Sequence, residues 1–345
     1  MSYYDTVRDR LTFAQKVKGK DSLSSLVYSE SWKSAASQWD CEHLFAHRVI
    51  CKEPRKRLPL FESRRLLPNN PGETSACIKA LVQGPESVDA LKYWMEPQFV
   101  QHYEPDSLGY VWAALTPFVR AGASSNHQVA ASEIAVREAS KRVTRRPAEL
   151  QDFVPSDQMT FGSSPPDFKH TSDSQGSHST LDYIESVVAP PVEDASVRLA
   201  GCFIRCVLNY GQSQDQTDPF LYFRDERQRY TFWQDGICMV HAIDDGGIQF
   251  INQNGQSRQV AMLEAKRHFA RVDEGKPIIS DQQLAQMFFH FHISDNYHSS
   301  YVDFLTDSNE HLLVESTVWM DIKNRGHRED IAAHILALIA WGKVF

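Results

Sequence analysis

The residues best suited to catalysis lie near the end of the segment AIDDGGIQFINQNGQSRQVAMLEAKR, residues 242–267, which closes with Glu264, Ala265 and Lys266. In a strand, side chains two residues apart share a face, so Glu264 and Lys266 are expected to point the same way. Burying an unpaired carboxylate or ammonium costs free energy, so a functional role is expected for both side chains. A carboxylate that binds Mg²⁺, beside a lysine that orients water or stabilises charge on phosphate, is typical of metal-dependent phosphodiester hydrolysis.

Such a site needs a second carboxylate, and Asp245 is the main candidate. It precedes the strand that is expected to pair with the segment of Glu264 across a hairpin at 254–255, Asn-Gly. Two glycines follow Asp245 and allow close approach of backbone and substrate. Asp244 competes for the same role, and Asp235 is a weaker candidate. The alternative for both residues of the Asp-Asp pair is a turn, where aspartate before glycine is common.

The elements that must position these side chains are predicted from residue 181 onward. Apolar residues at helical spacing predict a helix at 192–211, and Glu193 in its first turn offers a third carboxylate. An acidic residue there also stabilises a helix through its dipole, which is the structural alternative for Glu193. Further helices are expected at 280–294 and 328–341, and strands at 220–233, 237–243, 246–252, 258–267, 301–306 and 311–322. Together they predict an α/β protein with a mixed, α+β arrangement of helices on a sheet.

The first part of the chain has a different character. Residues 1–144 are expected to be mainly helical, because 87–103 and 128–143 carry apolar residues at three-and-four spacing. Residues 145–180 are rich in Ser, Pro and Asp and poor in aliphatic residues, which predicts a flexible linker. The sequence therefore divides into a helical N-terminal region, a linker, and a domain at 181–345.

The order of these features resembles the PD-(D/E)XK nuclease superfamily: a helix with a glutamate, then a carboxylate, a hairpin and Glu-x-Lys. More narrowly, the segments RDERQRYTF, AIDDGGI, LEAKR and SDQQLAQMF resemble nuclease-like domains that are common in fungal proteins. The resemblance covers residues 181–345. It implies a restriction-endonuclease-like αβββαβ core and hydrolysis of DNA or RNA with Mg²⁺ or Mn²⁺.

The resemblance also implies roles for individual residues. Asp245 and Glu264 match the acidic motif positions as catalytic metal ligands, and Lys266 matches the motif's lysine. Gln286 falls where some members place a glutamine on the next helix, and Glu193 resembles the acidic residue of the first helix, a further metal ligand. The sequence departs from the family pattern before Asp245, where no proline stands.

Charge is unevenly distributed along the chain. Residues 1–150 hold 21 basic and 17 acidic residues, whereas residues 151–345 hold 15 basic and 27 acidic residues. The net charge of the whole chain is −8. An acidic half is unusual for a surface that meets a polyanion, so basic clusters at 52–57, 62–65 and 141–146 are candidates for phosphate contacts. The alternative function is a catalytically silent nuclease fold that binds nucleic acid, or a protein partner, through the N-terminal region.

Cysteine and histidine usage favours no structural metal. The six cysteines form no CxxC pair, which predicts free thiols and an intracellular protein, cytoplasmic or nuclear. His43 and His47 have a zinc-compatible spacing, but no further ligands lie at suitable distances, so a structural role is expected. The longest apolar run, 331–342, is too short to span a membrane. The oligomeric state is left open.

Overall fold

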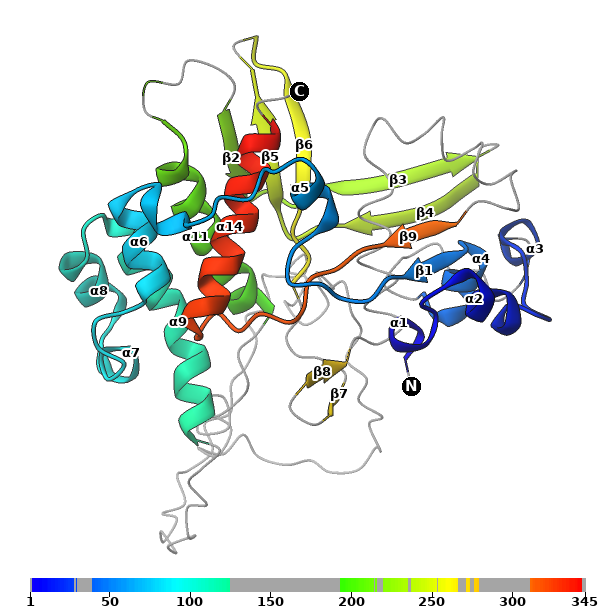
Figure 1. Ribbon diagram of the computed structural model, residues 1–345, viewed down its shortest axis with the longest axis horizontal. Coiled ribbons are helices and arrows are strands. Elements are labelled where there is room, and N and C mark those ends of the chain that lie inside the picture. Colours follow the sequence, from blue (N-terminus) through cyan, green and yellow to red (C-terminus); the bar gives the residue numbers. More distant parts are fainter. Residues whose placement is uncertain are drawn as a thin grey trace, which may run out of the picture. The chain divides into compact units, whose positions relative to one another are not determined.

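The computed structural model of the 345-residue chain describes residues 2–27, 29, 39–124, 193–213, 215, 220–234, 237–252, 254–265, 271–273, 276–278 and 311–342 (Figure 1). Residues 1–121 and 189–345 form one compact unit, and residues 122–188 form a second. The first unit combines helices and small sheets, so the predicted α+β arrangement is confirmed.

A three-stranded antiparallel sheet holds the segment of interest. Its strands are β2 (Phe220–Arg224), β5 (Gly247–Ile251) and β6 (Ser257–Met262), in the order β2-β5-β6. The hairpin between β5 and β6 turns at 254–255 as predicted, and Gly255 there has a φ of 72°. Gly247 pairs with Arg224 on one side and with Met262 on the other, so β5 is the central strand.

The predicted single strand at 220–233 is wrong. It divides into β2 and β3 (Arg229–Gln234), because β3 pairs with β4 (Ile237–Ile243) while β2 pairs with β5. Residues 225–228 between them are polar and exposed, and form the turn where the chain leaves the three-stranded sheet. The predicted strand at 237–243 is confirmed.

Four short strands form two further pairs. β1 (Val49–Cys51) pairs in parallel with β9 (Leu312–Val314), and β7 (Arg271–Asp273) pairs with β8 (Lys276–Ile278). The strand predicted at 311–322 is thus only three residues long, because β1, its partner, ends at Cys51. Among the described residues, pairing beyond that point is limited to one isolated bridge between Arg55 and Thr317. The elements predicted at 128–143, 280–294 and 301–306, and the linker, lie outside the described residues.

Helices make up most of the described part of residues 1–124, and two long helices begin and end the part that is described from residue 193 onward. The predicted helix at 87–103 is two helices, since Trp94 is extended and Pro97 lies in the first turn of the second. The helices are α1 (Tyr3–Thr6), α2 (Arg10–Lys16), α3 (Leu23–Val27), α4 (Cys41–Ala46), α5 (Pro59–Ser63), the 3₁₀ helix η2 (Pro71–Glu73), α6 (Ala76–Gln83), α7 (Ala90–Tyr93), α8 (Glu96–His102), α9 (Asp106–Ser124), α11 (Glu193–Gly211) and α14 (Arg325–Gly342).

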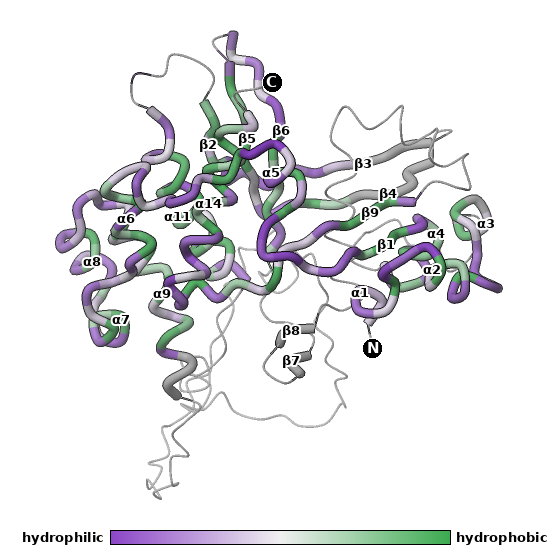
Figure 2. The backbone as a smooth tube through the Cα atoms, viewed as in Figure 1, coloured by the Kyte–Doolittle hydropathy of each residue, from purple (hydrophilic) through white to green (hydrophobic). Residues whose placement is uncertain are grey.

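The main hydrophobic core is shared by helices from both ends of the chain. It joins buried residues of α6, α8, α9, α11 and α14 with Leu221, Phe223 and Ile248 of the sheet. Hydrophobic stretches on β2 and along α9 and α14 are visible in Figure 2. Residues 77–115 and residues 199–339 therefore both contribute to this core.

Buried polar contacts tie α14 and α11 to α6. The guanidinium of Arg328 in α14 donates to the carbonyls of Leu81, Val82 and Gln83 at 2.9–3.1 Å, which satisfies the C-terminal end of α6. The Sγ atoms of Cys77 in α6 and Cys206 in α11 lie 3.5 Å apart. Both thiols are free, as is that of Cys202, which agrees with the prediction for these three cysteines.

A second core contains five aromatic residues of the N-terminal part: Tyr3, Tyr4, Phe13, Trp39 and Phe45. Tyr3 donates a hydrogen bond of 2.6 Å to the Val49 carbonyl and contacts Phe45 edge-to-face. His43 and His47 are buried and stack on Trp39, with ring centroids 5.3 and 4.8 Å apart. Within the described parts of the chain, no helix is both long and apolar enough to cross a bilayer.

Candidate metal centre

Asp245 and Glu264 lie just beyond the paired ends of β5 and β6. The last paired residues of the two strands are Gly247 and Met262. Beyond them, Asp245 N donates to the Leu263 carbonyl at 2.9 Å, and Leu263 N donates to the Gly246 carbonyl at 2.8 Å, so Asp245 and Gly246 both oppose Leu263, as in a β-bulge. The hairpin therefore brings Asp245 and Glu264 to the same end of the sheet, where their carboxylate oxygens lie within 4.8 Å of each other.

The Asp245 carboxylate is nearly buried, with 5% of the side chain exposed. Its Oδ2 accepts a hydrogen bond of 3.0 Å from the backbone N–H of Ala265. The Ala265 N–H is therefore not available for pairing with a neighbouring strand. Accordingly β6 ends at Met262, and Glu264 lies beyond the end of the strand. The predicted strand at 258–267 is therefore too long, and strand periodicity does not place Glu264.

Glu193 completes a group of three carboxylates. It lies in the first turn of α11, and α11 packs on β2 in the sheet that holds Asp245. A carboxylate oxygen from each of Glu193, Asp245 and Glu264 lies within 4.8 Å of the other two. Among the described residues this is the only group of three or more acidic, histidine or cysteine side chains close enough to hold a metal ion.

The spacing of the three carboxylates is somewhat wider than one small cation requires. Mg²⁺ binds oxygen at about 2.1 Å in octahedral geometry, so neighbouring ligand oxygens lie about 3.0 Å apart and opposite ones about 4.2 Å apart. The three oxygens lie within 4.8 Å of one another, so those of neighbouring ligands need to approach by up to about 1.8 Å. Rotations about the side-chain bonds of Glu193 and Glu264, which are both only partly buried, can supply this approach.

Asp244 has a different role from its neighbour. It is fully buried, and its carboxylate accepts from the Arg224 guanidinium, from the Gln228 backbone N–H at 2.8 Å and from the Tyr230 hydroxyl at 2.8 Å. These three donors direct the carboxylate toward the start of β3. The structure thus groups Asp245, and not Asp244, with Glu193 and Glu264.

Two glycines allow the backbone to fold this closely. Gly246 has a φ of 134°, and a Cβ atom on it would lie 2.7 Å from the Arg224 carbonyl oxygen. A Cβ atom on Gly247 would lie 2.5 Å from the Ala261 carbonyl oxygen. The sequence prediction that these glycines permit close backbone approach is confirmed, and the approaching groups are neighbouring strands.

Replacing Gly246 by alanine is expected to lower the free energy of unfolding by about 2 kcal/mol or more, because it combines an unfavourable φ with a backbone clash. Urea denaturation measures this. Gly255→Ala is the matched control: its φ is also positive, at 72°, but no atom lies within 4 Å of the added Cβ. A smaller loss at Gly246 than at Gly255 would contradict the packing described.

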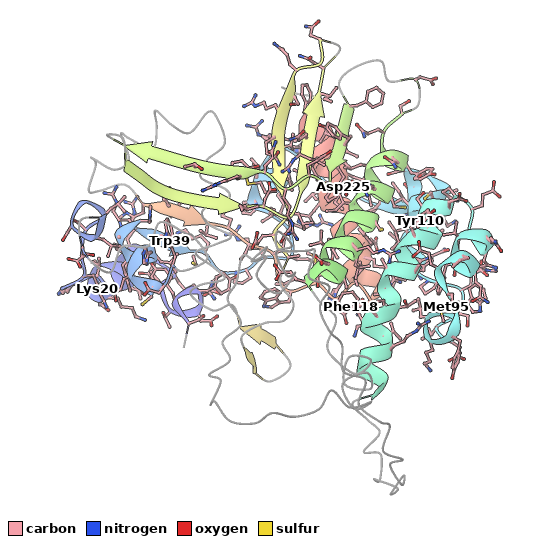
Figure 3. All side chains as sticks on the ribbon, turned by 180° about the vertical axis from the view of Figure 1, so that it is seen from behind. Lys20, Trp39, Met95, Tyr110, Phe118 and Asp225 are labelled. Carbon is pink, nitrogen blue, oxygen red and sulfur yellow. The ribbon has the colours of Figure 1, made fainter. Side chains whose placement is uncertain are left out.

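Sequence reasoning missed Arg227, a half-exposed residue of the turn between β2 and β3. Its Nη2 lies 3.4 Å from Asp245 Oδ1 and 3.3 Å from Asp194 Oδ1. Asp225 in the same turn, labelled in Figure 3, pairs instead with Arg205 of α11. The turn was not predicted because the alternating pattern of 220–233 is typical of a single strand. The polar run Asp-Glu-Arg-Gln at 225–228 was the sequence signal that could have indicated a turn.

The remaining predicted site residues cannot be placed. Lys266, Gln286 and Asp235 lie outside the described residues. Comparisons with protein-family models, with curated proteins and with solved structures give no match for this chain. What supports a function is therefore the chemistry of the three carboxylates and the elements that bring them together.

Proposed function

We propose that Glu193, Asp245 and Glu264 bind a divalent cation, Mg²⁺ or Mn²⁺, and that the chain hydrolyses phosphodiester bonds in DNA or RNA. One observation carries the proposal. Three carboxylates chosen from the sequence as metal ligands come from separate segments, yet their oxygens lie within 4.8 Å of one another. Hard divalent cations prefer such oxygen ligands.

The order of elements supports the same proposal. α11, β2, β5 and β6 follow each other as helix, strand, strand and strand, with the β3–β4 hairpin inserted after β2. This agrees with the first four elements of the αβββαβ core of PD-(D/E)XK nucleases, which the sequence resembles. In that core acidic residues accompany the second strand, the third strand and the helix. Here Asp245 precedes β5, Glu264 follows β6 and Glu193 lies in the first turn of α11, which supports the proposal.

The chain's own residues have separable tasks in this reaction. A bound cation polarises a phosphate oxygen and lowers the pKa of a bound water molecule. The Ala265 N–H holds the Asp245 carboxylate in one orientation, and the burial of Asp245 limits competition from water. Lys266, two residues after Glu264, is proposed to orient the attacking water, and Gln286 to assist on the following helix.

The test is cleavage of end-labelled single- and double-stranded DNA and RNA by the full-length protein with Mg²⁺ or Mn²⁺. Cleavage is expected for at least one substrate, and EDTA should abolish it. Glu264→Gln should lower the rate at least about tenfold, because it removes one ligand charge. Glu226→Gln, an exposed glutamate of the β2–β3 turn, should have no effect. Intact substrates, or cleavage that persists in EDTA, would contradict the proposal.

A second function, a catalytically silent module that binds nucleic acid, is favoured by one observation. The cationic residues of 52–65 are mostly exposed: Arg55, Lys56, Arg57, Arg64 and Arg65. Such a surface can neutralise phosphates, so binding should weaken steeply with salt. This function predicts nucleic-acid binding without cleavage that is unchanged by Asp245→Asn.

A further inference from the structure

Arg227 is the one basic residue that the structure places against the candidate metal centre within the described part of the chain. Its Nη2 bridges Asp245 of the centre and Asp194, the neighbour of Glu193 in α11. Asp245 Oδ2 already accepts the Ala265 amide, which leaves Oδ1 as the better-placed ligand atom for a cation. Oδ1 is the oxygen that Arg227 faces, at 3.4 Å. A metal ion bound by Oδ1 would therefore compete with Arg227 for the same atom.

The contacts of Arg227 are suited to being exchanged. Its side chain is half exposed, and both carboxylate distances, 3.3 and 3.4 Å, exceed those of a well-formed charge-assisted hydrogen bond. Arg224, three residues earlier, is the opposite case, because its side chain and that of its partner Asp244 are buried. The turn 225–228 belongs to neither strand, so Arg227 can move without breaking the sheet.

We propose that Arg227 acts as a counter-ion to Asp245 in the metal-free centre, and that a divalent cation displaces it; this rests on the proposed function of the three carboxylates. Three carboxylates this close repel one another, and the guanidinium offsets part of that repulsion until the metal arrives. Once displaced, Arg227 remains tethered beside the centre with its charge no longer paired with Asp245. A guanidinium there can form a bidentate contact with the phosphate that the metal binds.

The first test measures Mn²⁺ affinity of the metal-stripped full-length protein by isothermal titration calorimetry. Removing a positive charge within a few ångströms of the ion should tighten binding about five-fold in Arg227→Ala. Arg227→Lys keeps the charge and should bind nearly as the unaltered protein does. Arg205→Ala is the matched control, since Arg205 pairs with Asp225 and not with the three carboxylates, and it should have no effect.

The outcomes separate this inference from the proposed function. If the unaltered protein binds Mn²⁺, Asp245→Asn loses it, and Arg227→Ala binds no more tightly, the counter-ion role is wrong and the metal centre stands. If Arg227→Ala alone binds Mn²⁺ measurably, the counter-ion role is supported directly. If neither protein binds Mn²⁺, both proposals are wrong.

The second test addresses the phosphate contact, with Ca²⁺ as the ion and short single-stranded DNA and RNA oligonucleotides as probes. Arg227→Ala should weaken Ca²⁺-dependent binding of at least one probe about tenfold and lower the slope of log affinity against log salt by about one, as loss of one phosphate contact does. Equal affinity and equal slope for the two proteins would overturn the phosphate contact.

Discussion

Asp245→Asn is expected to reduce metal-dependent cleavage by about a hundred-fold or more while the protein stays folded. Removing a residue that only supports a metal ligand typically lowers metal affinity or activity 10- to 100-fold. Loss of the charge of a ligand itself should therefore lower activity by at least the upper end of that range. Asparagine has nearly the same shape and keeps an oxygen that can accept the Ala265 amide. Mutual repulsion among the carboxylates also falls, so the melting temperature should be unchanged or slightly higher.

Initial cleavage rates and thermal melts, each with and without Mn²⁺, check this expectation. The unaltered protein should be stabilised by Mn²⁺, because an ion that binds only the folded state raises its stability, and Asp245→Asn should lose that increment. Asp225→Asn is the matched control: Asp225 is exposed and pairs with Arg205. Retention of more than about half the activity in Asp245→Asn would contradict a ligand role, since a lost ligand costs far more than that.

Arg224→Ala is expected to lower the free energy of unfolding by about 3–5 kcal/mol, because it leaves the Asp244 carboxylate buried without its ionic partner. Asp244 has no exposed side-chain surface, and that of Arg224 is 4% exposed. The Gln228 amide and the Tyr230 hydroxyl still donate to Asp244, but neither carries a charge. The loss should therefore fall within the range for a broken buried ion pair.

Urea denaturation measures this loss, with Arg205→Ala as the control for an exposed ion pair, which should cost under about 1 kcal/mol. Replacing both buried partners, as Arg224→Met with Asp244→Leu, should recover most of the stability, since neither charge is then left unpaired. If Arg224→Ala were as mild as Arg205→Ala, the pair could not be buried as described.

The two adjacent aspartates should therefore give opposite signatures. Asp245→Asn removes activity and Mn²⁺ stabilisation while the melt is kept, whereas loss of the Arg224 partner of Asp244 lowers the melt. The distinction comes from their donors. Asp244 accepts from three groups that join β2 to β3, while Asp245 accepts one amide and faces two other carboxylates.

The three carboxylates could be predicted because local signals fix the segments that carry them. Asn254 and Gly255 specify the hairpin that brings Asp245 and Glu264 to the same end of the sheet, and the apolar spacing after Glu193 specifies the helix that begins there. Strand periodicity failed at Glu264 because β6 ends at Met262. That ending depends on the Asp245 side chain binding the Ala265 amide, a contact between residues 20 positions apart.

Features that depend on distant partners could not be read from the pattern. The sequence of 220–233 alternates as one strand would, and only the pairing of β3 with β4 divides it and exposes Arg227 in the turn. Helical spacing in the N-terminal region does not show which other helices it packs against. The packing of α6 against α11 and α14 joins segments far apart in the chain, so this contact could not be read from the sequence.

Anomalous scattering from Mn²⁺ in crystals of the protein tests the proposed metal centre most directly. We expect an ion bonded at about 2.0–2.4 Å by carboxylate oxygens of Glu193, Asp245 and Glu264, with Arg227 turned away from Asp245. At saturating Mn²⁺, an empty centre with Arg227 still against Asp245, or an ion held by other residues, would contradict it.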